Sequence, residues 1–509
     1  MRSFRLISRF VVLLVVGTTI TLGAGTATAA ACKKTIAVTD AGDAASPISG
    51  QLRTAIAELC SGGTILLPAG VIINLAQGEL VIPSGKVLTI RSPSHQQQAT
   101  IDAQGTSRVF WVQVNASLTL RNVIVTGGAG AGINNEGSLT IASGRVTANT
   151  GFGITNTGQV TLMDDAAITE NQGSGVFNGI NITDDVVGRL TLEDNSTINA
   201  NTGLRGGGIF NAGGAVTLND NSSVSGNVAA TGGGIWTGAS EVIDSGLVTL
   251  NDSSHISGNE ADSEGGGILN AHSSNLSANV LNDTSRITHN VAPFGAGIGG
   301  RGVITLNDQS TVAANTGTGI HNVRGGVFLN DRSSVVGNEG VGVLAFGIGL
   351  TMNDESSIVG NAGVGVYVIA ASAILNDAAR ISDNDGGGVS VSGAFLTLNG
   401  SSTISGNTTQ GDGGGVYLDG YLILNDDSSI AGNVGRFGGG IYNLNFAVEP
   451  SECPYLCVIL NGSSTITGNV ATGGAGGGIY NENDGTVIVN DNGSITGNSP
   501  DDCYPPASC

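Results

Sequence analysis

The sequence predicts an all-β protein, a three-sided parallel β-helix of about fourteen or more coils that carries a short capping helix at its N-terminal end. Two observations lead to this fold class. A motif recurs at steps of 23 to 36 residues, and apolar and polar residues alternate inside each copy. A content of 83 glycines in 509 residues would also suit a flexible chain, but 40% of the residues are hydrophobic. That fraction is too high for a disordered chain.

The repeats are seen most clearly in segments such as 216-VTLNDNSSVSGN-227 and 458-VILNGSSTITGN-469. Each copy has an apolar origin residue before Asn-Asp or its variant. The origins are Leu162, Leu192, Leu218, Leu250, Leu281, Leu306, Leu329, Met352, Leu375, Leu398, Leu424, Leu460 and Val489. Leu120 and Ile141 belong to earlier, degenerate copies. A period in this range is typical of stacked supersecondary units.

Each copy contains three short runs of alternating residues. Around the second anchor, for example, Ser223-Val224-Ser225 alternates with the period of a β-strand, and clusters of Gly, Asn, Asp and Ser bound every run. A third apolar anchor, such as Ile235, follows a glycine-rich segment. We therefore expect three strands per coil with one apolar side chain per face pointing inward. Each inward side chain contributes about 1.5–3 kcal/mol when the neighbouring coils bury it.

Two polar positions repeat with the strands. Asparagine lies nine residues after every origin, from Asn171 to Asn498, and predicts a ladder of stacked amides. The Asn-Asp pair after the origin has two interpretations, a calcium site between stacked carboxylates or an Asx turn at a corner. We favour the turn, because Gly400 and Gly462 replace the aspartate in two copies.

The two ends differ from the repeats. Residues 1–31 have the basic front, apolar stretch and small-residue site of a signal peptide, and a lipid anchor on Cys32 is an alternative outcome of processing. Residues 32–75 are expected to form an N-terminal cap with a short amphipathic helix, in which Leu52, Ala55, Ile56 and Leu59 share one face. Residues 76–498 form the β-helix, and residues 499–509 form a polar tail. What covers the last coil stays open.

The composition indicates a secreted or cell-surface protein. Six cysteines fit an oxidising compartment and fall into three local pairs that predict the disulfides Cys32–Cys60, Cys453–Cys457 and Cys503–Cys509. The net charge of −21 makes nucleic acid a poor partner. No later segment is long and apolar enough to span a membrane.

The motifs 225-SGNVAATGGGIW-236 and 467-TGNVATGGAGGGIYN-481 resemble the Gly-Gly-Ala-Ile repeats of polymorphic outer-membrane proteins and other right-handed parallel β-helix proteins of the pectate-lyase-like superfold. The segment 52-LRTAIAELCSGGTILLPAG-70 resembles the first coil of bacterial surface β-helix proteins, with matches at Leu52, Arg53, Ala55 and Ile56. The resemblance implies right-handed coiling and an adhesin-like role at the cell surface.

Fold alone does not decide function. We expect a non-catalytic binding or structural module whose partner is a carbohydrate or a surface protein, with no cofactor. Insertions lengthen the segment 443–457, so the first candidates for a recognition loop are Tyr442, Phe446 and Tyr455.

The alternative function is a polysaccharide lyase or hydrolase. Its candidate catalytic residues are Glu260, Asp262 and Glu264, which share one loop, and Arg205, which the repeat places at the matching corner two coils earlier, about 10 Å away. Acidic residues on a solvated loop explain the same pattern.

Overall fold

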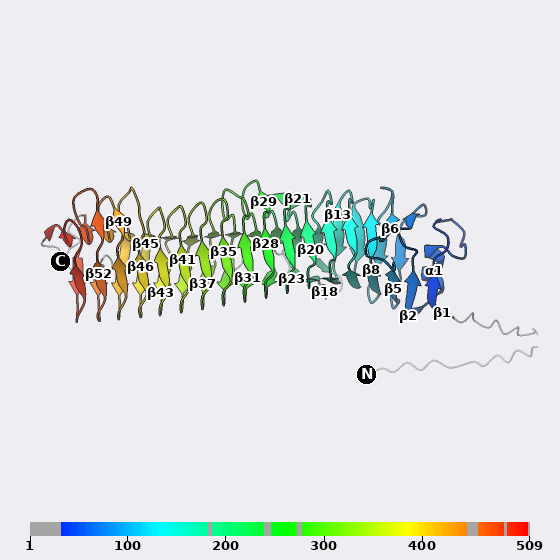
Figure 1. The fold of residues 1–509 in the computed structure, drawn as a ribbon, viewed down its shortest axis with the longest axis horizontal. Helices are drawn as coiled ribbons and strands as arrows, with labels where there is room; N and C mark the ends of the chain where they lie inside the picture. Colours follow the sequence, from blue (N-terminus) through cyan, green and yellow to red (C-terminus); the bar gives the residue numbers. More distant parts are fainter. Residues whose placement is uncertain are drawn as a thin grey trace, which may run out of the picture.

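The computed structural model describes residues 32–181, 186–238, 246–271, 277–444, 457–482 and 486–506. The chain winds into an elongated parallel β-solenoid, as Figure 1 shows, so the predicted all-β solenoid is confirmed. From residue 59 onward, each turn contributes one strand to each of three ladders, and neighbouring strands within a ladder pair in parallel. The second ladder has 17 strands. The sequence motif gave a lower count because the first turns lack the Asn-Asp motif, although Ile65, Ile90, Leu120, Ile141 and Leu162 pair in one continuous register.

The first ladder contains the origin residues. Its strands are β1 (Lys33–Ala37), β2 (Leu59–Leu66), β5 (Val87–Arg91), β8 (Ser117–Arg121), β11 (Ser138–Ala142), β14 (Gln159–Met163), β19 (Arg189–Leu192), β23 (Ala215–Leu218), β27 (Leu247–Leu250), β31 (Ala278–Leu281), β34 (Val303–Leu306), β37 (Gly326–Leu329), β40 (Gly349–Met352), β43 (Ser372–Leu375), the C-terminal parts of β45 (Val389–Leu398) and β47 (Val416–Leu424), β51 (Cys457–Leu460) and β55 (Thr486–Val489).

The second ladder contains the anchors six residues after the origins. Its strands are β3 (Ile72–Asn74), β6 (Ala99–Asp102), β9 (Val123–Thr126), β12 (Arg145–Thr147), β15 (Ala167–Thr169), β20 (Thr197–Asn199), β24 (Ser223–Ser225), β28 (His255–Ser257), β32 (Arg286–Thr288), β35 (Thr311–Ala313), β38 (Ser334–Val336), β41 (Ser357–Val359), β44 (Arg380–Ser382), β46 (Thr403–Ser405), β48 (Ser429–Ala431), β52 (Thr465–Thr467) and β56 (Ser494–Thr496).

The third ladder follows the glycine-rich segments. Its strands are β4 (Leu80–Ile82), β7 (Phe110–Val112), β10 (Ala131–Asn135), β13 (Phe152–Asn156), β16 (Val176–Asn178), β22 (Ile209–Ala212), β26 (Ile235–Gly238), β30 (Ile268–Asn270), β33 (Ile298–Gly300), β36 (Ile320–Asn322), β39 (Val343–Phe346), β42 (Val366–Ile369), the N-terminal parts of β45 and β47, β50 (Ile441–Asn443), β54 (Ile479–Asn481) and β57 (Cys503–Tyr504).

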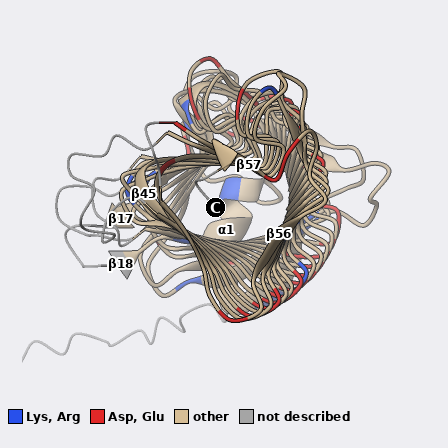
Figure 2. Cartoon of the chain, turned by 90° about the vertical axis from the view of Figure 1, so that its left-hand side faces the viewer, with Lys and Arg blue, Asp and Glu red and all other residues tan. Residues whose placement is uncertain are grey.

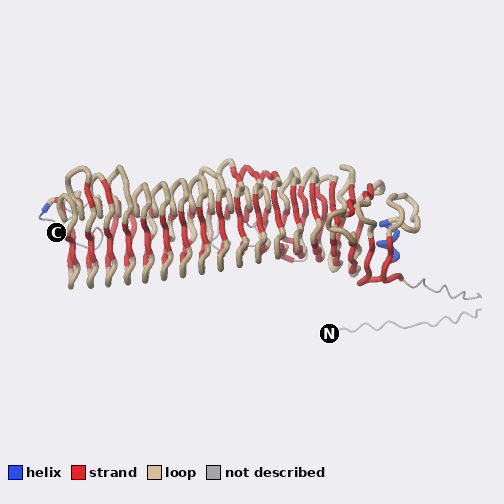
Figure 3. The backbone as a smooth tube through the Cα atoms, in the orientation of Figure 1, coloured by secondary structure: helices blue, strands red, loops and turns tan. Residues whose placement is uncertain are grey.

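Loops rise along one edge of the stack between the second and third ladders, as the tube in Figure 3 shows. Several of them carry short strands of their own. These are β21 (Thr202–Arg205), β25 (Val228–Thr231), β29 (Glu260–Ala261), β49 (Val434–Gly435) and β53 (Val470–Ala471). On another edge, β17 (Ile180–Asn181) and β18 (Val186–Val187) form a small antiparallel pair.

The interior consists of the stacked inward anchors. Leu218, Val224 and Ile235 of one turn are each fully buried and pair in register with Leu250, Ile256 and Ile268 of the next. The predicted asparagine ladder is confirmed. Fourteen asparagines from Asn149 to Asn498 are joined by amide–amide hydrogen bonds of 2.8 to 3.1 Å. Each amide group therefore has partners above and below, which removes the cost of burying it.

The corner after the origin carries the repeated aspartates, which gather in red along one corner of Figure 2. Asp220 and Asp252 both have a φ of 56°, the left-handed backbone of a tight turn. The Asp252 carboxylate accepts a 3.1 Å hydrogen bond from the Asp220 N–H, and the same contact recurs along the corner. Among the described residues, no group of three or more His, Cys, Asp and Glu side chains is arranged to hold a metal ion.

Glycine is required at the corner that precedes the third ladder, for two reasons. Gly206 opens a glycine triplet with a φ of 60°. Gly208 closes it, and a Cβ atom there would lie 2.8 Å from the carbonyl oxygen of Gly234 in the next turn. The triplets therefore allow successive turns to approach closely.

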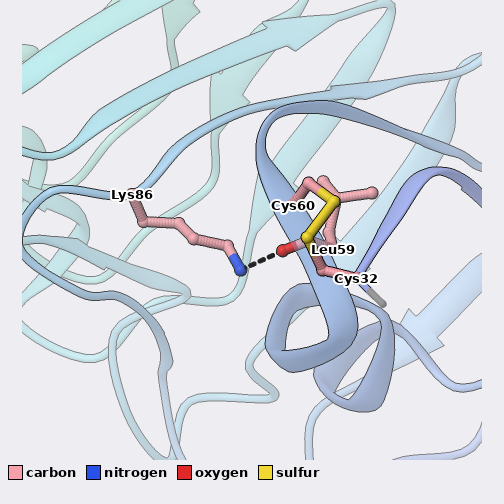
Figure 4. The surroundings of a disulfide bond; sticks show 4 residues. All are labelled: Cys32, Leu59, Cys60 and Lys86. Carbon is pink, nitrogen blue, oxygen red and sulfur yellow. Dashed lines mark hydrogen bonds between the residues drawn. A yellow bond between two sulfur atoms is a disulfide. The ribbon is translucent and has the colours of Figure 1, made fainter. Parts of the chain in front are cut away.

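The N-terminal end has the predicted helix, α1 (Leu52–Glu58), which buries Leu52, Ala55 and Ile56. Figure 2 looks along the stack and shows α1 lying across its far end. The predicted Cys32–Cys60 disulfide is confirmed, and Figure 4 shows it beside the hydrogen bond from Lys86 Nζ to the Leu59 carbonyl oxygen. Strands β2 and β3, which lie within residues 32–75, already pair with β5 and β6 of the stack.

At the C-terminal end the tail contacts the last turn. The amide of Asn498, the last member of the asparagine ladder, donates to the carboxylate of Asp502. Val489 of the last turn is 45% exposed, so the tail leaves part of this end open. Cys457 and Cys503 are disulfide-bonded, and their predicted partners Cys453 and Cys509 lie outside the described residues. No helix in the described ranges is long and apolar enough to cross a membrane.

Candidate functional site

The residues of the catalytic alternative lie on the loops between the second and third ladders. Arg205 ends β21, and its guanidinium carbon lies 5.4 Å from the centre of the Trp236 ring. Glu264 lies two turns further along and contacts His321, with 3.2 Å between Glu264 Oε1 and His321 Nδ1. Arg205 and Glu264 therefore lie two turns apart on the same edge and interact with different partners.

The other two acidic candidates, Glu260 and Asp262, are exposed to solvent. Neither forms an ion pair with another described residue. The backbone of Asp262 donates to the Ala229 carbonyl, which fixes the loop and leaves the carboxylate in solvent. The four predicted residues thus form no clustered acid–base arrangement of the kind that lyases and glycosidases need.

The predicted recognition loop needs a correction at Tyr442. Tyr442 lies in strand β50, not in a loop, and only 8% of the residue is exposed. The strand runs to Asn443, because Ile441-Tyr442-Asn443 pairs in register with β47 and β54. Phe446 and Tyr455 lie outside the described residues.

Tyr442 instead belongs to a feature that the sequence reading missed. We call it the outer column, the 17 outward positions of the third ladder that pair in one register. They are Val81, Trp111, Asn134, Thr155, Phe177, Phe210, Trp236, Leu269, Gly299, His321, Leu344, Tyr367, Ser390, Tyr417, Tyr442, Tyr480 and Tyr504. Both tryptophans of the chain and five of its seven tyrosines lie in this column, although aromatic residues make up only 4% of the sequence.

The C-terminal part of the outer column is a tyrosine stack of Tyr417, Tyr442, Tyr480 and Tyr504. Successive ring centres lie 5.2 to 5.4 Å apart, and the rings are nearly parallel, with interplanar angles of 5° to 16°. The inner ring faces cover one another, so Tyr442 is buried within the stack, whereas Tyr417, Tyr480 and Tyr504 are partly exposed. The outer face of Tyr504, which is 41% exposed, ends the stack.

Carboxylates surround the tyrosine stack. The Tyr442 hydroxyl donates to Glu482, and burial together with this carboxylate raises the pKa of Tyr442 far above its ordinary value. Burial also raises the pKa of Tyr417, reinforced by Asp412 and Asp419. The phenols of Tyr417 and Tyr442 are therefore held neutral, as hydrogen-bonding groups rather than proton-transfer groups.

The middle of the outer column packs differently. Phe177 and Phe210 meet edge to face at 5.3 Å, and Phe210 and Trp236 meet edge to face at 4.9 Å. Arg205 covers Trp236 from the loop above. Such pairs stabilise the sheet by about 0.5–1.5 kcal/mol each.

The N-terminal part of the outer column borders an open cleft of about 800 Å³. Asn134 and Thr155 of the column line it together with Gln77, Glu79 and Arg108. Arg108 donates to the Glu79 carboxylate at 2.7 Å and lies 5.9 Å from the centre of the Trp111 ring. A cleft of this volume with an ion pair, an amide and hydroxyl groups suits a polar ligand of small-molecule size or one unit of a polymer.

Chemically, the outer column provides aromatic surface, neutral hydroxyl groups and one polar cleft along a continuous line. Sequence reading had a signal for it, because the residue after the third anchor is aromatic in Ile209-Phe210, Ile235-Trp236, Ile441-Tyr442 and Ile479-Tyr480. Only the register shows that these residues lie on one line.

Comparisons with known proteins give no family. No family model matches the chain, and no curated protein matches it. A solved structure that is similar is the A-module of mannuronan C-5 epimerase AlgE6 from Azotobacter vinelandii, with 15% identity and a TM-score of 0.26 over 92% of this chain and 100% of that chain. Likeness at this level carries no argument, and the resemblance to polymorphic outer-membrane proteins stays a prediction.

Proposed function

We propose that this chain is an extracellular, non-catalytic binding protein that holds a polysaccharide along the outer column. The observation that carries the proposal is the concentration of aromatic residues on one outward face of the solenoid. Outward faces of exposed sheets usually carry polar residues. Aromatic side chains with polar groups beside them are typical of recognition surfaces.

The length of the outer column favours a polymer over a compact ligand. Its 17 positions repeat at the spacing of adjacent strands, about 4.8 Å. A linear chain of sugars offers apolar ring faces and hydroxyl groups at regular intervals, which match aromatic edges and phenol hydroxyls. The net charge of −21 disfavours nucleic acid, the other common linear polymer.

The extracellular location is part of the proposal and rests on the signal-like residues 1–31 and on the Cys32–Cys60 disulfide. An adhesin-like role follows from a rigid rod that displays a long binding face.

A catalytic role is supported by one contact, the Glu264–His321 pair beside the outer column. A lyase or hydrolase needs a second acid or base within reach of the same sugar unit. Arg205 is engaged with Trp236 instead, so the geometry favours binding without turnover.

The test uses the two tryptophans as reporters, because both lie in the outer column. We would titrate the full chain with neutral and acidic polysaccharides, follow tryptophan emission, and run affinity electrophoresis in parallel. Trp111→Ala and Trp236→Ala should weaken retardation. The matched control is Thr465→Ala, an outward residue of the second ladder, which should leave it unchanged.

Retardation by a polysaccharide that depends on the tryptophans would support the proposal. Free migration with every polysaccharide would refute it and direct the search to a protein partner. Release of new reducing ends or of unsaturated sugars, lost in Glu264→Gln, would show that the chain is an enzyme.

A further inference from the structure

A second feature lies on a different face, the outward side of the second ladder. A hollow of about 440 Å³ is lined there by His255, Arg286 and His289 with five neutral polar residues. The neutral residues are Asn221, Ser253, Ser257, Thr284 and Thr288. No carboxylate lines it, although the chain has 40 acidic and only 19 Lys and Arg residues.

The three basic residues are departures from the repeat. His255 and Arg286 pair in register between Ser223 and Thr311, so small hydroxyl residues occupy the same position in the turns before and after. His289 has a φ of 56° at a corner position that is Gly258 in the preceding turn. Two of the five histidines of the chain and one arginine thus lie together in two adjacent turns.

The basic groups have no acidic partner within the described structure. Arg286 is exposed and forms no ion pair with another described residue. The nearest acidic side chains along the chain are Asp252 and Asp283. Their carboxylates accept the backbone N–H groups of Asp220 and Asp252, at 3.1 and 3.0 Å, which directs them along the neighbouring corner.

We propose that this hollow binds a tetrahedral oxyanion, the sulfate or phosphate ester group of a small molecule or of a glycan. A guanidinium presents planar donors to such a group, and the imidazoles and hydroxyls add donors from other directions. The Ser253 and Thr284 hydroxyls lie 3.1 Å apart, so one anion is able to reach both. The volume accommodates the esterified unit as well as the ester.

The titration of His255 gives a second signature. Burial of its imidazole holds the pKa of His255 below its ordinary value, with a smaller contribution in the same direction from Arg286 and an opposing one from its hydrogen bond with the Ser253 backbone. A bound anion stabilises the protonated imidazole, so affinity should rise as the pH falls. The groups around it are Asn221, Ser223 and Ser225 from the turn before, Arg286, Thr288 and His289 from the turn after, and Asp252 and Asp283 at the corner.

The experiment titrates the full chain, labelled with ¹³C-histidine, with glucose 6-sulfate and glucose 6-phosphate. Glucose and acetate serve as a neutral and a carboxylate control. The imidazole signals of His255 and His289, assigned with His255→Ser and His289→Gly, should shift saturably with the esters. Arg286→Thr should weaken binding by about tenfold or more.

The variants restore residues that the repeat itself uses, so the fold should be retained. Arg380→Thr is the matched control, because Arg380 occupies the same column, between Ser357 and Thr403, away from the hollow. The substitution removes the same charge as Arg286→Thr. It should leave affinity unchanged.

A saturable shift with both esters supports a general oxyanion site. A shift with only one ester identifies the bound group as the sulfate or the phosphate. Absence of a saturable shift, equal binding of acetate, or an equal loss in Arg380→Thr would overturn the proposal. The site is independent of the outer column, so the failure of either proposal leaves the other standing.

Discussion

The second and third ladders are built on the same backbone and differ in what they show to solvent. In the second ladder the outward residues are mainly serine and threonine. None of its 17 strands contains Phe, Tyr or Trp at any position. In the third ladder, both tryptophans and most tyrosines of the chain face outward. The inward residues, such as Ile256 and Ile235, are equally buried in both. The fold thus fixes the inward residues alone and leaves the outward positions free to differ.

The largest expected effect tests whether the two interiors are equivalent. Ile256→Ala in the second ladder and Ile235→Ala in the third each remove a fully buried side chain and leave a cavity between turns. We expect both to destabilise their turns by about 2–5 kcal/mol, and by similar amounts. Amide hydrogen exchange of the flanking strands measures this. A much larger loss for Ile235→Ala would show that the outer column above it is part of the stabilising structure.

Substitutions at outward positions should cost less stability than those in the core, and the cost should differ between the third and second ladders. Tyr442→Ala removes ring contacts with Tyr417 at 5.4 Å and with Tyr480 at 5.3 Å, and the hydrogen bond to Glu482. We expect a cost of about 3 kcal/mol, since each of the two aromatic pairs and the hydrogen bond contributes about 1 kcal/mol.

The matched variant on the other face is Ser429→Ala, in the second ladder of the same turn, for which we expect a change within about 0.5 kcal/mol. Urea unfolding followed by circular dichroism compares the two. Equal effects would remove the distinction between the faces.

The sequence predicted the inward side well and the outward side poorly, for one physical reason. Inward positions face identical neighbours above and below, so Leu218, Val224 and Asn227 recur in nearly every copy and are visible as a pattern. Outward positions contact solvent on one side and tolerate different residue types. At the positions equivalent to Trp236 and Tyr442, aromatic residues recur as a class, but no single residue type does.

The sequence also could not predict side-chain contacts between turns. The Arg205–Trp236 and Glu264–His321 pairs join residues that are 31 and 57 positions apart in the chain. Their partners depend on the length of each intervening loop, and the repeat steps vary too much for the sequence to fix which side chains meet. Tyr442 was assigned to a loop for the same reason.

Alkaline pH should weaken the tyrosine stack and spare the second ladder. The folded-state pKa of Tyr442 is raised by burial and by Glu482, so its contribution is fully present below the unfolded tyrosine pKa of about 10 and is lost as the pH rises through the folded value. Tyr442→Phe lacks this titration. Wild type should therefore lose more stability than Tyr442→Phe between about pH 9 and about pH 11, measured by urea unfolding. Parallel losses in the two proteins would assign the effect to other groups.

The smallest effect concerns the contact of Arg205 with the outer column. Arg205→Gln removes a guanidinium 5.4 Å from the Trp236 ring, and we expect a loss of about 0.5–1 kcal/mol together with a change in tryptophan emission. Arg380→Gln is the control, because Arg380 is exposed on the second ladder between Ser357 and Thr403 and contacts no aromatic ring of the described residues. An unchanged emission in Arg205→Gln would mean that Arg205 leaves the ring in solution. That result would return Arg205 to the list of groups free to act on a ligand, and would strengthen the catalytic alternative against the binding proposal.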